Sequence, residues 1–89
     1  MSENLQKLRR RIDRIDRRLV KLLARRYKEV CLIGRLKREA NRDVVDPERE
    51  EDVLKRVLRL VKEEEQSEYI RSIYLSIFKE SSNIQREGV

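Results

Sequence analysis

The 89-residue sequence contains no histidine and only one cysteine, Cys31. The absence of histidine excludes histidine metal sites, histidine acid-base catalysis and serine-histidine triads. One cysteine without histidine offers no nucleophile pair and no internal disulfide, so Cys31 is best interpreted as a small packing residue. We expect no metal centre in this chain.

Turn-forming residues and long apolar runs are also scarce. The chain has two glycines and one proline, and 38% of its residues are hydrophobic while 45% are charged. This composition is typical of long helices, so we expect a single all-α domain with no strands. No run approaches the roughly 18 apolar residues of a membrane span, and no signal-peptide pattern or glycine-rich phosphate loop is present. We expect a cytoplasmic protein without a membrane partner.

The most informative pattern is a long apolar seam in the first part of the chain. Its residues recur every three or four positions: Leu5, Leu8, Ile12, Ile15, Leu19 and Leu22. The pattern predicts a helix over about residues 3–39, and its next seam position is Arg26. A guanidinium cannot lose its proton and is costly to bury alone, so Arg26 indicates that an anion must meet it.

The length of this helix predicts a dimer. About 35 helical residues span about 50 Å at 1.5 Å per residue, whereas a compact globule of this chain length is only about 30 Å across. The helix therefore extends beyond any core that one chain can build. The overhanging leucines need a second chain to cover them.

Two shorter helices are expected after the first. Asp46 followed by a proline is a strong start signal for a helix over about 47–64, with Asp46 as its N-cap. Ser67 is the expected N-cap of a third helix over about 68–86, which Gly88 should end. Three helices, one long and two shorter, then account for nearly the whole chain.

Each expected helix carries polar residues on its apolar face. Arg26 and Lys37 lie 11 residues apart, which is three turns and nearly the same face of the first helix. Glu50 precedes the apolar stripe of the second helix by one turn, and Ser81 and Gln85 extend the apolar line of the third. We interpret these five residues as parts of one site.

Each of these residues also has an ordinary structural explanation. Arg26 could form a buried ion pair with Glu29 or Glu50, Lys37 could be a solvated lysine, and the polar end of the third helix could mark fraying. Their coincidence on three helices favours a site. Fixed cations, an amide and carboxylates suit binding an anion in one shape and stabilising charge that develops during a reaction, as in a unimolecular rearrangement.

The same residues resemble the all-helical chorismate mutases over nearly the whole chain. The resemblance rests on the spacing of five segments: Leu8 to Asp16, Leu22 to Arg26, Ile33 to Lys37, Asp46 to Glu50, and Ser81 to Gln85. It implies an intertwined homodimer of three-helix chains. It also implies a cofactor-free Claisen rearrangement of chorismate to prephenate, a step in phenylalanine and tyrosine biosynthesis.

The resemblance also implies a role for each site residue. Arg26 would grip one substrate carboxylate, and Arg9 would reach the other carboxylate from the partner chain. Lys37 would contact the ether oxygen and a carboxylate, and Gln85 would donate to the ether oxygen. Independently, Arg9 and Arg26 are 17 residues apart, or about 25 Å along one helix, so one small molecule can meet both only if they come from two chains.

The remaining roles come from the same resemblance. Asp46 and Glu50 would hold the substrate hydroxyl, Arg49 would orient the site, and Ser81 would assist at a carboxylate. A related helical family on this scaffold removes pyruvate from isochorismate with similar cations. The acidic pair of Asp46 and Glu50 favours the mutase.

The positive charge of the chain is also compatible with a different class of function, nucleic-acid binding. The chain has 23 Lys and Arg against 17 Asp and Glu, a net charge of +6, and its arginine clusters lie in the first helix. Such charge attracts nucleic acid as well as small polycarboxylates. A basic helical dimer that binds nucleic acid would leave Glu50, Ser81 and Gln85 unexplained, so we expect a small dicarboxylate substrate and no nucleic-acid partner.

Overall fold

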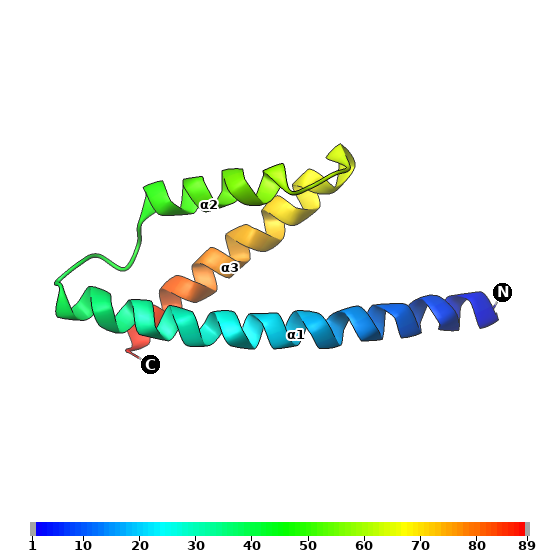
Figure 1. Cartoon of the computed structure of the whole chain (residues 1–89), viewed down its shortest axis with the longest axis horizontal. Helices are drawn as coiled ribbons and strands as arrows, with labels where there is room; N and C mark the ends of the chain where they lie inside the picture. The colour runs from blue at the N-terminus through cyan, green and yellow to red at the C-terminus, as the bar shows by residue number, and fades with distance from the viewer. Residues whose placement is uncertain (1, 89) are drawn as a thin grey trace.

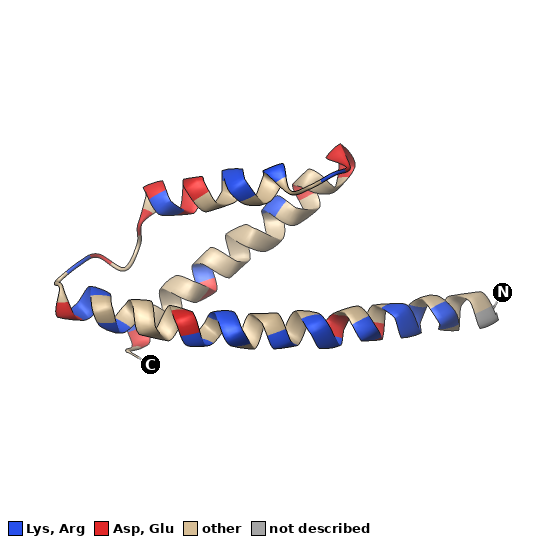
Figure 2. Ribbon diagram, in the orientation of Figure 1, with Lys and Arg blue, Asp and Glu red and all other residues tan. Residues whose placement is uncertain are grey.

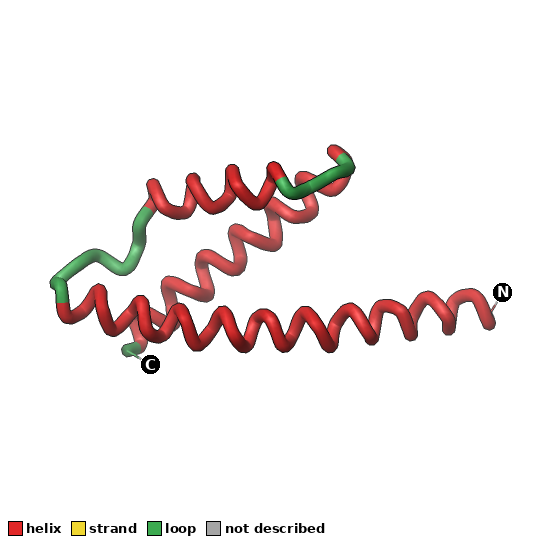
Figure 3. Tube along the Cα trace, viewed as in Figure 1, coloured by secondary structure: helices red, strands yellow, loops and turns green. Residues whose placement is uncertain are grey.

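The computed structural model describes the backbone of residues 2–88 and the side chains of residues 4–88, and all of its regular structure is helical (Figures 1 and 3). The elements in chain order are α1 (Ser2–Glu39), α2 (Pro47–Arg59), the short 3-10 helix η1 (Glu64–Gln66) and α3 (Ser67–Glu87). No strand occurs within residues 2–88. The predicted all-α class with one long and two shorter helices is confirmed.

The first helix ends with a turn that the backbone hydrogen bonds define. The N–H of Arg42 donates to the carbonyl of Lys37 at 2.8 Å, and that of Asn41 donates to Arg38 at 3.2 Å. Asn41 adopts a left-handed backbone with φ of 52°. This combination is the Schellman motif, in which a left-handed residue satisfies the last helical carbonyls and turns the chain away from the helix axis.

The second helix begins as expected but ends earlier. The Asp46 side chain accepts a hydrogen bond from the backbone N–H of Arg49 at 3.1 Å, which confirms it as the N-cap. The helix ends at Arg59 and not near residue 64, because the N–H of Leu60 bonds to the carbonyl three residues earlier and tightens the last turn. The acidic run at 63–65 would oppose the helix dipole at a C-terminus, which disfavours continuing the helix.

The third helix also differs from expectation at its start. Gln66 occupies the N-cap position but its side chain makes no capping hydrogen bond, and Ser67 is already the first helical residue. The reason is that η1 leads directly into α3, with the N–H of Gln66 bonded to the carbonyl of Glu63 at 2.9 Å. An N-cap residue needs a non-helical backbone, whereas the backbone of Ser67 is already helical, so Ser67 cannot act as the cap. Gly88 ends the helix with φ of 73°, as expected.

The three helices pack around α3. Helix α3 contacts both α1 and α2, whereas α1 and α2 make no close backbone contact with each other within residues 2–88 (Figure 1). The core is small: Val30 and Cys31 from α1 and Phe78 from α3 are its buried hydrophobic residues among those described. Tyr74 adds an edge-to-face contact with Phe78, with ring centroids 6.0 Å apart. This packing leaves a space between α1 and α2 that α3 closes on one side.

The N-terminal half of α1 projects away from the other helices (Figure 1). The molecule measures 57 × 27 × 15 Å, and its radius of gyration is 16.5 Å, against about 12 Å for a compact chain of this length. The six seam residues from Leu5 to Leu22 are each between 49% and 57% exposed. Basic residues occur along the length of α1 (Figure 2). None of the helices in the described part of the chain is long and apolar enough to cross a membrane.

The left-handed turn after α1 generates a stability prediction. We expect Asn41→Val to lower the free energy of unfolding by about 1–2 kcal/mol, because a β-branched residue is strained at positive φ. Asn41→Gly should keep or slightly raise the stability, since glycine adopts this backbone without strain. Urea denaturation of both variants beside the parent protein measures the difference. Equal losses in the two variants would show that the Asn41 side chain, and not its backbone, matters.

Candidate active site

A cavity of about 240 Å³ occupies the space between α1 and α2, with α3 as its floor. Seven of the eight residues predicted for the site line it: Arg26, Lys37, Asp46, Arg49, Glu50, Ser81 and Gln85. They come from all three helices. Other hollows in the described part of the chain are larger, but this cavity is the one lined by the polar residues on the apolar faces of the three helices.

Helix α1 supplies two cations that are anchored at one point each. The guanidinium of Arg26 donates to the hydroxyl of Ser81 at 2.7 Å, and the ammonium of Lys37 donates to the backbone carbonyl of Val44 at 2.7 Å. Neither Glu29 nor Glu50, both within the described residues, forms an ion pair with Arg26. An ammonium has three N–H donors and a guanidinium five, so both groups retain donors for a ligand.

Helix α3 contributes an ordered amide, which contradicts the interpretation of its end as frayed. Gln85 is 8% exposed, and its side-chain oxygen is buried without a hydrogen-bond partner. Leaving a buried polar atom unpaired costs about 1–3 kcal/mol, so such an atom needs an explanation. An amide oxygen only accepts hydrogen bonds, and a half-turn of the amide exchanges it with the donating NH2 group. A ligand that donates to the oxygen, or that accepts from the NH2 group after such a turn, would complete the hydrogen bonding of Gln85.

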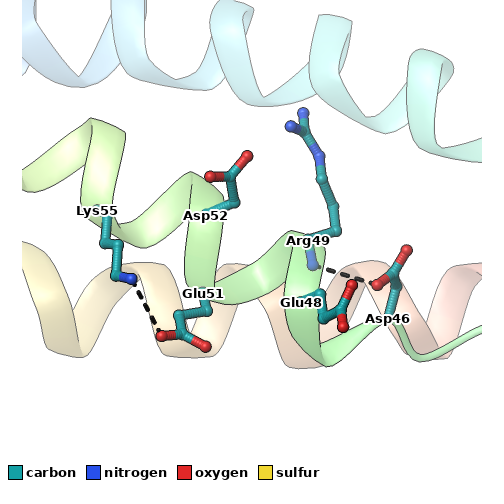
Figure 4. A pocket seen from close by; sticks show the side chains of 6 residues that line it. All are labelled: Asp46, Glu48, Arg49, Glu51, Asp52 and Lys55. Carbon is teal, nitrogen blue, oxygen red and sulfur yellow. Dashed lines mark hydrogen bonds and ion pairs between the residues drawn. The ribbon is translucent and has the colours of Figure 1, made fainter.

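The N-terminus of α2 places carboxylates opposite these cations. Asp46 precedes the helix as its N-cap, and Glu50 follows one turn later, with both side chains partly buried. Figure 4 shows this end of α2, where Arg49 extends away from the ion pair between Glu51 and Lys55, whose charged atoms are 3.2 Å apart. Asp46 and Glu50 thus lie on one side of the cavity at the start of α2.

Sequence reasoning missed one charged residue of the cavity. Arg42 lines it together with the neighbouring loop residue Val44. The left-handed turn at Asn41 brings this part of the loop back over the end of α1. No periodicity marks a loop residue, so the turn chemistry of Asn41 was the only signal that could have found Arg42.

The charges around the cavity suit a dianion. Four cations line it, namely Arg26, Lys37, Arg42 and Arg49, against the two acids Asp46 and Glu50, so that 4 − 2 leaves a formal charge of +2. Apolar side chains, including Val30, Ile33, Val53 and Phe78, form much of the remaining wall. Fixed charges beside apolar walls act at lower effective dielectric than in water, which strengthens their hold on an anion.

Two other hollows show different chemistry. A groove of about 330 Å³ between α1 and α3 is lined mainly by apolar residues, including Leu23 and Ile77. Tyr27 also lines it, and the electrostatic interaction with the neighbouring Cys31 raises the pKa of the Tyr27 hydroxyl above its ordinary value. A hollow of about 480 Å³ lies on α2 alone and is lined by the residues drawn in Figure 4. Within the described residues, no cluster of acidic and cysteine side chains could hold a metal ion.

Arg9 is the one predicted site residue that lies away from the cavity. It is exposed on the projecting half of α1, and α1 is continuous from Ser2 to Glu39. The 17 residues between Arg9 and Arg26 therefore correspond to about 25 Å of helix. A single chain does not bring Arg9 to a molecule in its own cavity.

A family model and a similar protein indicate the same family for this chain. The chorismate mutase type II family matches residues 8–86 of the chain. A chorismate mutase of Methanocaldococcus jannaschii is 30% identical over 88 residues, which cover 98% of this chain and 89% of that protein.

Two bifunctional proteins are also similar. The chorismate mutase/prephenate dehydratase of Aquifex aeolicus is 44% identical over 61 residues, or 68% of this chain, and that of Buchnera aphidicola is 38% identical over 77 residues, or 85% of this chain. The matched segments are 17% and 20% of the lengths of those two proteins. No solved structure shows significant similarity to the chain.

Proposed function

The chain belongs to the chorismate mutase type II family, and on that basis we propose that it converts chorismate to prephenate by a cofactor-free Claisen rearrangement. The observation that carries the proposal is the cavity itself. It combines a formal charge of +2 with a buried amide, that of Gln85, in its wall. Chorismate is a dicarboxylate whose rearrangement breaks a C–O bond and needs no proton transfer. The charge and the donors of the cavity match both requirements.

Two groups of the cavity meet the charge that develops on the ether oxygen. As the C–O bond breaks, this oxygen gains negative charge, and we assign Lys37 and Gln85 as its hydrogen-bond donors. Contacts that strengthen as charge develops lower the barrier, whereas contacts that are equal in substrate and transition state do not. The carbonyl of Val44 anchors the Lys37 ammonium, so little reorganisation of this donor is needed at the reacting step.

The other cavity residues hold the substrate in its reactive shape. We assign Arg26 to one carboxylate, with Lys37 adding a second contact, and Asp46 and Glu50 to the substrate hydroxyl. Ser81 accepts a hydrogen bond from Arg26, which supports a role in fixing that guanidinium in addition to assisting at the carboxylate. Holding both ends of a flexible molecule removes conformational freedom before the reaction.

Loss of ultraviolet absorbance from chorismate, with prephenate identified as the product, tests the activity directly. Lys37→Ala and Gln85→Ala should each lower kcat by about 10²- to 10³-fold, the usual effect of removing one donor to developing negative charge. Lys62→Ala is the control, because Lys62 is exposed on the turn between α2 and α3. Release of pyruvate from isochorismate without prephenate formation would contradict the assignment and favour the lyase.

We also propose that the working unit is a homodimer in which α1 of one chain covers the other. The exposed seam from Leu5 to Leu22 supports this, since six half-exposed leucines and isoleucines in one line are costly in water. The apolar groove between α1 and α3 continues this surface beside the cavity. Among the side chains that the structure describes, three buried hydrophobic residues are also a small core for a chain of this size.

Sedimentation velocity and thermal unfolding test the dimer. We expect a dimer at micromolar concentration and a melting temperature that rises with protein concentration, because association and folding are then coupled. Leu8→Glu and Ile15→Glu should weaken the dimer, while Leu60→Glu, a change at an exposed residue after α2, should not. A compact and fully active monomer would contradict this proposal and the role given to Arg9.

A dimer would also explain Arg9. Because Arg9 and Arg26 are held about 25 Å apart on one continuous helix, they can serve one substrate only from different chains. We propose that Arg9 of one chain binds the second carboxylate in the cavity of its partner. The helix that supplies Arg26 to its own site would then supply Arg9 to the other.

Complementation between two inactive variants tests this arrangement. Arg9→Ala and Arg26→Ala should each be nearly inactive, since a charged hydrogen bond to the substrate is worth about 2–4 kcal/mol in the transition state. Mixing the variants after denaturation and refolding should restore at most about a quarter of the parent activity. Half of the refolded dimers are heterodimers by statistical pairing, and each has one intact site of two. Verified heterodimers that stay inactive would refute the assignment.

A further inference from the structure

We propose that Arg38 is a positioning residue that fixes the last turn of α3 against α1 and thereby holds the Gln85 amide in the cavity. The inference rests on the proposed function, in which Gln85 is a donor to the reacting oxygen. Arg38 does not line the cavity and would act only through Gln85. It lies next to Lys37 in the sequence, at the last turn of α1.

The first observation is a hydrogen bond between the two helices. A guanidinium nitrogen of Arg38 donates to the backbone carbonyl of Gln85 at 3.0 Å. Helix α3 ends at Glu87, so this carbonyl is one of the last four that have no partner within the helix. A cation at a helix C-terminus is also favoured by the helix dipole. Arg38 therefore satisfies the backbone of the residue whose side chain faces the substrate.

The second observation is the close approach of the helices one turn earlier on α1. A Cβ placed on Gly34 would lie 3.2 Å from both Cα and Cγ of Gln85. Gly34 is buried and lies four residues before Arg38, on the same face of α1. Two residues on one face of α1 thus meet Gln85: the backbone of Gly34 leaves no room for a side chain beside it, and Arg38 donates a hydrogen bond to its carbonyl.

The end of α3 shows why such an anchor is needed. Residues 86–88 are exposed, and Gly88 leaves the helix with φ of 73°. A Cβ placed on Gly88 would lie 3.8 Å from the guanidinium carbon of Arg38, so the Arg38 side chain also lies beside the last turn of α3. A helix end has few contacts of its own and frays readily. Without Arg38, we infer that this turn would open and the amide would leave its position.

Steady-state kinetics of three variants test the inference in the full chain. Arg38→Met keeps the length and apolar stem of the side chain and removes its charge; it should lower kcat about tenfold or more, because small misplacements of a donor are costly. KM should change less than about twofold, since Arg38 does not touch the substrate. Arg38→Lys should recover part of the loss. Arg35→Met, on an exposed residue of the same helix, is the matched control and should leave kcat unchanged.

A double-mutant cycle separates positioning from a general structural effect. In the Gln85→Ala background, Arg38→Met should cause no further loss of kcat, because the group through which it acts is gone. A loss equal to that in the parent background would overturn the proposal, as would an unchanged kcat in Arg38→Met alone.

Amide hydrogen exchange provides a test that does not depend on activity. Arg38→Met should raise the exchange rate of the amides at the C-terminal end of α3, and Arg35→Met should not. Unchanged exchange in Arg38→Met overturns the positioning role whatever the activity. If the parent protein does not convert chorismate, the proposed function fails, and the exchange data alone still decide whether Arg38 fixes the last turn of α3.

Discussion

The rigidity of α1 is the constraint on which the rest of the structure depends. One unbroken helix from Ser2 to Glu39 fixes the spacing of every group it carries, because each residue advances about 1.5 Å along the axis. Arg26 and Lys37 fall on one face and both reach the cavity. Arg9 is carried away from the same cavity by the same rigidity. The proposed dimer follows from this geometry together with the exposed seam, and a shared site then needs no flexibility in α1.

Hydrogen bonds within the chain fix the groups around the cavity. Arg26 is anchored on Ser81, Lys37 on the carbonyl of Val44, and the backbone of Gln85 on Arg38. The anchors of Arg26 and Lys37 are neutral oxygens, so the positive charge of these two side chains remains available to an anion in the cavity. Fixed donors that do not need to reorient contribute most to stabilising developing charge. In the proposed function, a small chain without histidine would thereby act on its substrate by electrostatics alone.

The comparison between sequence and structure shows which signals were reliable. Asp46 before a proline correctly marked the start of α2, because N-capping is a local interaction between adjacent residues. The end of α2 and the cap of α3 were wrong, since the sequence has no glycine or proline there and the chain turns through tightened backbone bonds and η1. Arg42 was missed because loop residues carry no periodicity. Arg38 showed no anomaly on an apolar face, and only its contact with Gln85 revealed it.

The sequence by itself determined the helical class, the length of α1 and the faces on which Arg26, Lys37, Glu50, Ser81 and Gln85 lie, because helical periodicity is a local property. Only the tertiary structure decided that these faces meet around one cavity, since the crossing of α1 over α3 depends on contacts between distant residues such as Gly34 and Gln85. It also decided that Gln85 is buried and not frayed. Burial and hydrogen-bond partners arise from the packing of separate helices, which no single stretch of sequence encodes.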